Sequence, residues 1–360
     1  MFLLTLLLIP MVIALIAYLS MGKAITYKEF LLQLGIQIVF GSICAGVVYW
    51  SNLTDYETWS GRIVGKTREQ VHCRHSYECF CYESCSGSGS SRSCMRICQT
   101  CYHHSYDVDW WTKDSVGERF NVNTIDWQGL QEPSRWTSIR IGEPSASSHS
   151  YDNYIKKSDT LFRRQGATNY EGLPGYPGQV YDLYRINRTV TVDMSLPDAE
   201  DWDNRLDEIN ADLGRSKEVN AVLVLVKNKP RDYFQALEAA WLGGKKNDAI
   251  LVIGVDNENK IQWADVMAFT DNKLFNVILR DAILEIGTLD KEKIFTAFGW
   301  SINTQYKRKS MSDLEYLKYG ITPTTTQWVI CMILGFLLSL GIAFWVFTED
   351  VFSEELRRWR

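Results

Sequence analysis

Three long apolar segments stand out from an otherwise polar chain. Residues 2–20, 30–50 and 327–347 contain no Asp, Glu, Lys, Arg or His. Each segment is about 20 residues long, the length that an α-helix needs to cross roughly 30 Å of hydrocarbon. The pattern therefore predicts three transmembrane helices, with the lipid bilayer as one partner. A cleaved signal peptide is the alternative for the first segment, but no Lys or Arg precedes its apolar run.

The charges that flank these segments predict an orientation. Lys23 and Lys28 lie in the short loop between the first two segments, and the tail after the third contains Arg357, Arg358 and Arg360. The flanks of the long intervening region carry fewer positive charges. The positive-inside rule then places the short loop and the C-terminal tail in the cytoplasm. We expect residues 51–326 to lie in the periplasm or an equivalent extracytoplasmic space.

Small residues recur every four positions inside two of the segments. They are Ser42 and Gly46 in the second segment, and Gly335, Ser339 and Ala343 in the third. Such stripes allow helix backbones to approach closely, so we expect helix packing along them. Because none of the three segments contains Asp, Glu, Lys, Arg or His, the usual marks of a proton or ion pathway are absent from them.

Seven of the nine cysteines lie within 29 residues. They are Cys73, Cys79, Cys81, Cys85, Cys94, Cys98 and Cys101, and His72, His75, His103 and His104 lie within or directly beside this stretch. A disulfide framework is one interpretation, because the Gly/Ser-rich loop at residues 86–93 cannot build a core and a small module needs covalent links. Because seven is odd, such a framework leaves one free thiol, an intermolecular disulfide or a partly reduced set of cysteines.

Zinc is the competing interpretation of the cluster. Its candidate ligands are the thiolates of Cys79, Cys81, Cys98 and Cys101, with the histidines as alternates. The compartment decides between the two chemistries, because disulfides persist in oxidising spaces. The predicted topology favours disulfides, which would also use Cys73, Cys85 and Cys94, whereas the reverse topology would favour zinc.

Composition and pattern divide the chain into seven parts. We expect a two-helix membrane hairpin (1–50), a stalk and Cys-rich module (51–110), an aromatic-rich region of strands and loops (111–192), an α/β domain (193–305), a juxtamembrane linker (306–326), a membrane helix (327–347) and a tail (348–360). Alternation over residues 136–141 predicts a short strand. The expected fold class is a multi-pass membrane protein with a mixed α/β extramembrane region.

The region 193–305 has the clearest alternation of elements. Residues 221–226 (AVLVLV) and 249–255 (AILVIGV) are short apolar runs typical of buried strands, and residues 261–267 predict a third strand. Apolar residues at helical spacing predict helices over 198–213, 231–242, 272–286 and 290–300. The order α-β-α-β-β-α-α predicts a small sheet covered by helices.

This region resembles the TPM domain family. The resemblance covers residues 198–300 and rests on the element order and on the junction Trp241-Leu-Gly-Gly-Lys-Lys-Asn-Asp248 before the strand 249–255. Members of that family are membrane-anchored domains that face a periplasm, lumen or extracellular space. They are associated with assembly or maintenance of membrane complexes, and some bind calcium or act as phosphatases. The Cys-rich module and residues 151–154 also look similar to uncharacterised membrane proteins of large tailed bacteriophages.

Four aspartates of this domain are candidate cation ligands. They are Asp248, Asp256, Asp265 and Asp271. Carboxylate oxygens suit calcium, and ligands in open α/β sheets bind beyond the carboxyl ends of the strands. Ordinary turn carboxylates are the alternative. The chain has Asn247-Asp248 where the family has Asn-Gly, and it lacks the family's Asp-Arg pair in the following hairpin, a departure that weighs against phosphate chemistry.

Two function hypotheses follow. The first is a membrane-anchored interaction or scaffold protein that presents the Cys-rich module and the TPM-like domain to a protein partner or a second copy. The chain contains no G-x-S-x-G, Walker A, HExxH or Rossmann motif, which favours this hypothesis over an enzyme. The second is a calcium-dependent, phosphatase-like hydrolase, as the resemblance implies. A net charge of −5 offers no electrostatic footprint for nucleic acid as a partner.

Overall fold

The computed structural model describes residues 27–87, 93–155, 170, 172–178, 180–182 and 184–349, together with residues 8, 12, 13 and 16. These residues form two compact units. The first contains the described parts of 1–56, 150–163 and 310–360, and the second those of 57–149 and 164–309. The first predicted membrane segment and the predicted tail lie almost entirely outside the described residues.

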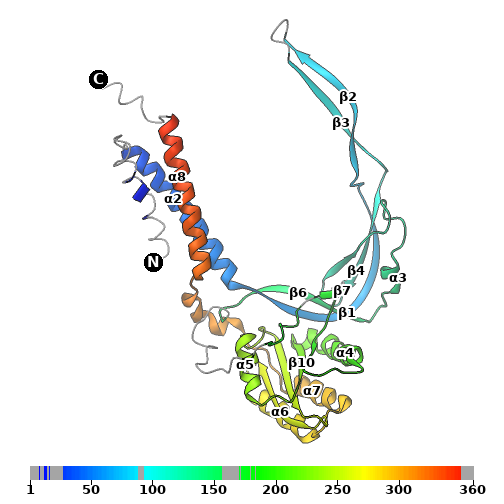
Figure 1. Cartoon of the computed structure of the whole chain (residues 1–360). Helices are drawn as coiled ribbons and strands as arrows, with labels where there is room; N and C mark the ends of the chain where they lie inside the picture. The colour runs from blue at the N-terminus through cyan, green and yellow to red at the C-terminus, as the bar shows by residue number, and fades with distance from the viewer. Residues whose placement is uncertain are drawn as a thin grey trace. The chain divides into compact units, whose positions relative to one another are not determined.

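Two long apolar helices dominate the first unit (Figure 1). Helix α2 spans Tyr27–Leu53 and helix α8 spans Thr325–Glu349, and a 3₁₀ segment, η2 (Met311–Gly320), precedes α8. Within them, Leu31–Leu53 and Thr325–Trp345 are long and apolar enough to cross a membrane. They correspond to the second and third predicted segments.

The contact between α2 and α8 uses only part of the predicted small-residue stripes. Gly335 and Ser339 of α8 are buried, as the four-residue spacing predicts. Ser42 and Gly46 of α2 are exposed, so the prediction for α2 is wrong. The buried face of α2 lies elsewhere, and Gln33 on that face donates from Nε2 to Ser339 Oγ at 2.7 Å. A polar contact of this kind holds apolar helices together where lipid offers no hydrogen bonds.

An antiparallel sheet begins directly after α2. Its strand order is β5-β4-β1-β6, with β1 at Thr54–Val71, β4 at Asp107–Asp114, β5 at Arg119–Val122 and β6 at Pro144–Asp152. The predicted stalk is therefore largely strand β1, and the predicted boundary at residue 110 lies inside β4. The core of the sheet includes Ile63, Trp110 and Val122.

Residues 136–141 do not form the predicted strand. Helix α3 occupies Ser134–Ser138, and Trp136 on it packs edge-on against Trp110 at 4.7 Å. Trp136 also donates from Nε1 to the carbonyl of Trp111 at 3.0 Å. These two contacts to β4 override the weak local alternation, because a partly buried indole gains more from packing and a hydrogen-bond partner than from local propensity.

The Cys-rich residues form a separate two-stranded sheet, drawn as a long ribbon in Figure 1. Its strands are β2 (Ser76–Ser86) and β3 (Ser93–Tyr102), which pair antiparallel. A second small sheet joins β7 (Val180–Asp182) to β8 (Arg185–Ile186).

The α/β domain is a four-stranded sheet with helices on both faces. Its strand order is β12-β11-β10-β9, where β9 is Thr189–Val192, β10 is Asn220–Lys227, β11 is Asp248–Val255 and β12 is Ile261–Ala268. The helices are α4 (Ala199–Lys217), α5 (Asp232–Ala240), α6 (Phe275–Ile286) and α7 (Lys291–Gln305). Strands β9, β10 and β11 are parallel, and β12 is antiparallel to β11. The predicted element order is confirmed, with β9 added before the predicted start at residue 193.

Two apolar cores lie on opposite faces of this sheet because successive strand residues point to alternate sides. Leu223 and Leu251 face α4, α6 and α7, and Val224 and Val252 face α5. The Gly/Pro-rich segment around Leu173 packs against the α5 side, where Tyr176 also contributes. The aromatic side chains of this segment, Tyr170 and Tyr176, therefore contribute to the core.

Candidate functional site

Three disulfides hold the β2–β3 ribbon. They are Cys79–Cys101, Cys81–Cys98 and Cys85–Cys94, with Cα–Cα distances of 5.8, 4.0 and 4.0 Å. The predicted disulfide module is confirmed, and it includes the four cysteines that were the alternative zinc ligands. Cys73 is the seventh cysteine and remains a free, buried thiol. A disulfide-rich module of this kind is typical of an oxidising, extracytoplasmic compartment.

The ribbon has no hydrophobic core of its own. Every described residue of β2 and β3 is exposed or only partly buried. An isolated two-stranded hairpin is marginally stable in water, so this ribbon depends on its covalent links. Cys85 and Cys94 are direct cross-strand neighbours, whereas an irregularity between Cys79 and Tyr82 shifts the register near the other two bonds.

Phe80 lies at this irregularity, between two disulfide-bonded cysteines. Its backbone has φ of 47°, in the left-handed region that side chains other than glycine rarely adopt. Its side chain is 77% exposed, the highest value among the large hydrophobic residues that the structure describes. The ribbon therefore presents an aromatic ring outward from a backbone that is fixed on both sides, at Cys79 and at Cys81.

The ribbon joins the four-stranded sheet through two short connections. The β1–β4 ladder ends at the pair Val71–Asp107, and the β2–β3 ladder begins at Ser76–Tyr102. Between these ladders, residues 72–75 and 103–106 run side by side. One backbone hydrogen bond, from His103 N to the carbonyl of His75 at 3.1 Å, links them. This joint sets the direction in which the ribbon leaves the sheet.

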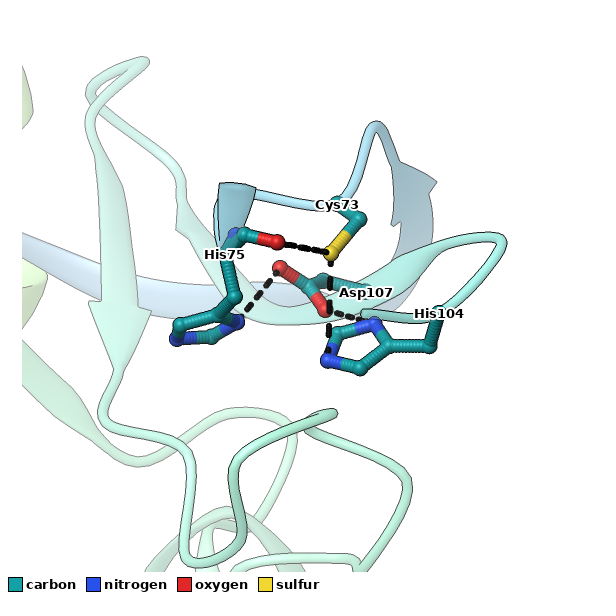
Figure 2. A group of neighbouring side chains, drawn as sticks. All are labelled: Cys73, His75, His104 and Asp107. Carbon is teal, nitrogen blue, oxygen red and sulfur yellow. Dashed lines mark hydrogen bonds and ion pairs between the residues drawn. The ribbon is translucent and has the colours of Figure 1, made fainter. Parts of the chain in front are cut away.

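Four polar side chains converge at the joint (Figure 2). They are Cys73 and His75 from the first connection, His104 from the second, and Asp107 at the start of β4. Each offers one ligand-type atom, and these atoms all lie within 4.8 Å of one another. The group thus combines one sulfur, two imidazole nitrogens and one carboxylate oxygen.

The contacts within this group are close. The Cys73 Sγ lies 3.8 Å from His104 Nε2, and Nδ1 of the same ring lies 2.9 Å from Asp107 Oδ1. The other carboxylate oxygen, Asp107 Oδ2, lies 3.7 Å from His75 Nδ1 and accepts a hydrogen bond from the backbone N–H of Arg74 at 2.8 Å. Cys73 is 2% exposed and Asp107 is 5% exposed, so the ligand atoms face inward.

Aromatic rings surround the group on its open side. Trp127 stands edge-on to His75 with ring centroids 4.7 Å apart, and it is tilted against His103 at 5.5 Å. A shallow hollow is lined by His103, His104, Asp126, Trp127 and Gln128. The joint is consequently partly shielded from water and accessible from one side.

The four candidate aspartates of the α/β domain do not come together. Asp248 is the first residue of β11 and Asp256 follows its last residue, which places them about 26 Å apart at 3.3 Å per strand residue. Asp265 lies in the middle of β12, opposite Val252, rather than at a strand end. They form no common cation site among the described residues, and no specific observation favours the hydrolase hypothesis.

Each of these aspartates already has protein partners. Asp248 is fully buried and accepts hydrogen bonds from Asn220, Tyr176 and the backbone of Lys245; burial raises its pKa. Asp256 caps a turn, where the backbone N–H of Lys260 lowers its pKa most strongly. Asp265 forms a two-pronged ion pair with Arg231 at 2.6 and 2.8 Å, and Asp271 lies 3.6 Å from Lys307 Nζ.

The sequence predicts part of the group at the joint. Cys73 was expected in the disulfides, the histidines were expected only as alternate zinc ligands, and Asp107 was not predicted. Two short motifs in the sequence could have indicated this group, namely Cys73-x-His75 and His104-x-x-Asp107. Each motif places two ligand types within a few residues of one another.

No protein family model matches the chain, and no curated protein or solved structure shows a significant similarity to it.

Proposed function

We propose that this protein is a membrane-anchored interaction protein whose extracytoplasmic region presents the β2–β3 ribbon to a protein partner. The observation that carries the proposal is Phe80, an exposed aromatic ring held between two disulfide-bonded cysteines. A segment whose backbone is fixed before binding loses less conformational entropy in a complex. Large aromatic side chains of this kind dominate the binding energy of protein interfaces.

Further apolar side chains on the ribbon support a protein contact. Tyr77, Tyr82 and Met95 are 45%, 58% and 67% exposed. Tyrosine, phenylalanine and methionine are enriched in protein interfaces, and a gathering of exposed apolar side chains marks an interaction surface. The ribbon also carries few charged residues among its described positions, as the centre of an interface does.

The helix pair supports the membrane anchor. Asn52 at the end of α2 donates from Nδ2 to Gln327 Oε1 at 3.0 Å and to the carbonyl of Thr322 at 3.2 Å. The last turn of α2 and the first turn of α8 are therefore neighbours, so the region between the helices leaves from one end of the pair. The three disulfides favour the oxidising side of the membrane for this region.

In this proposal the α/β domain is a TPM-like scaffold. The order of elements from α4 to α7 agrees with the order on which the resemblance rests. The domain is attached to strand β1 by buried hydrogen bonds, among them Asn247 Nδ2 to the carbonyl of Thr58 at 2.7 Å. A sheet held this firmly is a suitable support for a ribbon that binds a partner.

Site-specific photo-crosslinking in native membranes tests the proposal. A benzophenone amino acid would replace Phe80 in the full-length chain, and the matched control would carry it at Val64, an exposed position on β1. We expect a discrete crosslinked protein from position 80 and none from position 64. Mass spectrometry then identifies the partner as another protein or a second copy of the chain.

A ribbon that contacts lipid instead would contradict the proposal. In that case position 80 would yield crosslinks to lipid alone, and the full chain, already inserted in one membrane, would capture protein-free vesicles through the ribbon. Phe80→Ala would abolish that capture. Equal crosslinking from positions 80 and 64 would also count against a specific interface.

A further inference from the structure

We propose that Cys73, His75, His104 and Asp107 form a zinc site that locks the joint between the β1–β4 ladder and the β2–β3 ribbon. The four residues supply the ligand types that zinc uses in closed structural sites, namely thiolate, imidazole and carboxylate. They come in pairs from the two adjacent connections, so a single ion would bridge both chains of the joint (Figure 2). This inference does not depend on the identity of any partner.

The spacing of the ligand atoms fits a tetrahedral ion. Zinc–sulfur bonds of about 2.3 Å and zinc–nitrogen bonds of about 2.0 Å place these ligand atoms about 3.5 Å apart at tetrahedral angles. The Cys73 Sγ and His104 Nε2 are 3.8 Å apart. The same geometry places a nitrogen and an oxygen ligand about 3.4 Å apart, and His75 Nδ1 and Asp107 Oδ2 are separated by 3.7 Å. Adjustments of a few tenths of an ångström therefore complete the site.

Two atoms of the group make no hydrogen bond with acceptable geometry. They are His75 Nδ1 and Asp107 Oδ1, both buried, and Oδ1 lies 2.9 Å from His104 Nδ1 as an ion pair. An unsatisfied buried nitrogen or oxygen costs about 1–3 kcal/mol, and such groups are rare in folded proteins. Both atoms point into the same group as the Cys73 thiol, whose only hydrogen bonds are weak ones within its own connection and to His104. A cation bound by the group would engage the His75 nitrogen, the Cys73 sulfur and the Asp107 carboxylate together.

The His104 ring is oriented for coordination through Nε2. Its Nδ1 lies 3.2 Å from the carbonyl of Tyr106, which can only accept a hydrogen bond. Asp107 Oδ1, 2.9 Å from the same nitrogen, is also an acceptor, so this arrangement favours the proton on Nδ1 and leaves Nε2, which faces the Cys73 sulfur, for coordination. Metal-bound histidines commonly have their second ring nitrogen fixed by a carbonyl or carboxylate in this way, which sets the tautomer.

The donor set distinguishes zinc from other metals. Calcium and magnesium prefer six or more oxygen ligands, whereas this group offers only one carboxylate. Type-1 copper sites use two histidines and one cysteine with a weak thioether or carbonyl as the fourth ligand, so the carboxylate of Asp107 favours zinc. The other candidate group, Glu78 with Cys81 and Cys98, is excluded because its two sulfurs form a disulfide.

The site explains how the seventh cysteine keeps its thiol. Six cysteines of the module are consumed in three disulfides, and Cys73 has no cysteine partner among the described residues. Zinc coordination holds a sulfur as thiolate and shields it from oxidation. At the joint, the ion would add a rigid crosslink at the point where the backbone ladder is interrupted, and would fix the direction of the ribbon.

Metal analysis of the full-length protein tests this proposal. The chain would be purified in mild detergent with its disulfides intact, stripped with a chelator, reloaded with zinc chloride, and measured by elemental analysis after gel filtration. We expect about one zinc ion per chain. His75→Gln and His104→Gln should each weaken zinc binding by about tenfold or more, since each removes a ligand.

Adjacent histidines provide matched controls. His72→Gln and His103→Gln change the same residue type beside each ligand but outside the group of four, so they should keep the wild-type zinc content. Cobalt would report the thiolate ligand directly, because its sulfur-to-cobalt absorption should appear in the wild type and vanish in Cys73→Ser. Thiol counting before and after reduction would verify that each variant keeps three disulfides.

Three results would overturn the proposal. The first is a reloaded wild-type protein with an unmodified Cys73 thiol that retains no zinc. The second is zinc content that depends on His72 or His103 as strongly as on His75 or His104. The third is a protein that binds copper with an intense visible thiolate band and rejects zinc.

Discussion

Arg188 Nη2 donates to Ser60 Oγ at 2.8 Å, and this buried bond joins strand β1 to the α/β domain. The same guanidinium donates from Nε to Asn220 Oδ1 at 2.8 Å and forms an ion pair with Asp207. The backbone N–H of Arg188 donates to Asp203 Oδ1 at 2.7 Å. With 2% of its surface exposed, Arg188 is the centre of a polar network that links the two four-stranded sheets.

Replacement of Arg188 by leucine should destabilise the protein by about 3–5 kcal/mol. The change leaves the Asp207 carboxylate buried without its positive partner, which is the costly way to break a buried ion pair. Chemical denaturation of the full chain in detergent would measure the loss. Arg215→Leu, on the exposed side of α4, is the matched control and should change stability by less than about 0.5 kcal/mol. Equal effects of the two substitutions would contradict the role of the network.

Asp207 should make stability depend on pH near pH 6. Burial raises the pKa of this carboxyl to about 6, although Arg188 acts in the opposite direction. Between about pH 4 and pH 6 the folded state therefore holds a proton that the unfolded chain has released. The resulting stabilisation is present at low pH and is lost as the pH rises through about 6.

Thermal unfolding of the wild type and of Asp207→Asn over this range would measure the effect. The wild type should lose stability relative to Asp207→Asn as the pH rises from about 4.5 to about 7. Asparagine cannot titrate, so the difference between the two curves isolates this carboxyl from the others. Parallel curves across the range would show that the pKa of Asp207 is not raised in the folded protein.

The α/β domain could be predicted from the sequence because its signals are local. The apolar run at residues 221–226 is buried on both sides, and Trp202, Leu206 and Ile209 repeat at helical spacing on α4. Strand β1 could not be predicted, because its buried positions include polar residues whose partners are distant in the chain. Glu57 is 3% exposed and accepts two hydrogen bonds from Arg308 at 2.7 and 2.8 Å.

The group of four residues at the joint could also be predicted only in part from the sequence. The sequence revealed an unusual concentration of cysteine and histidine, and the odd number of cysteines indicated one thiol without a disulfide. Which thiol remains free depends on the register of β2 and β3, and the approach of Cys73 to Asp107 depends on the pair Val71–Asp107 between β1 and β4. The pair Val71–Asp107 joins residues that are far apart in the chain, and a ribbon without a buried face has no apolar alternation from which its register could be predicted.

Gly254 in β11 should not tolerate a side chain. A Cβ built on this residue would lie 2.1 Å from Cε2 of Trp263, whose own Nε1 donates to the carbonyl of Lys229 at 2.8 Å. Because Trp263 is packed and hydrogen-bonded, Gly254→Ala should destabilise the domain by about 1–3 kcal/mol. The matched control is Gly65→Ala in β1, where nothing lies within 4 Å of the added carbon.

Denaturation of the two variants would be compared with that of the wild type. Gly65→Ala should be neutral or slightly stabilising, because alanine restricts the unfolded chain more than glycine does. An unchanged free energy of unfolding in Gly254→Ala would contradict this prediction, because the Trp263 ring would then be able to move aside without loss of stability.

The contact between α2 and α8 should depend on Ser339. This residue is fully buried and accepts hydrogen bonds from Gln33 Nε2 at 2.7 Å through its hydroxyl and at 3.2 Å through its carbonyl. Ser339→Leu would remove one of these bonds and add bulk where the helices approach closely. Interhelical hydrogen bonds in membranes contribute about 0.6–1.7 kcal/mol, so we expect the paired state to lose at least about threefold in population.

Two native cysteines allow this loss to be measured. Cys44 of α2 and Cys331 of α8 are hydrogen-bonding neighbours across the helix pair, and both are free thiols. Mild oxidation of membranes should therefore link them in the wild type, and peptide mapping without reduction would quantify the disulfide.

Ser339→Leu should reduce the yield of this disulfide, whereas Ser42→Leu on the exposed face of α2 should not. If both variants crosslink as the wild type does, the Gln33–Ser339 contact does not hold the helices together. Loss in both would instead point to a general disturbance of the pair, because among the described residues the Ser42 hydroxyl bonds to the carbonyl of Ile38 in its own helix.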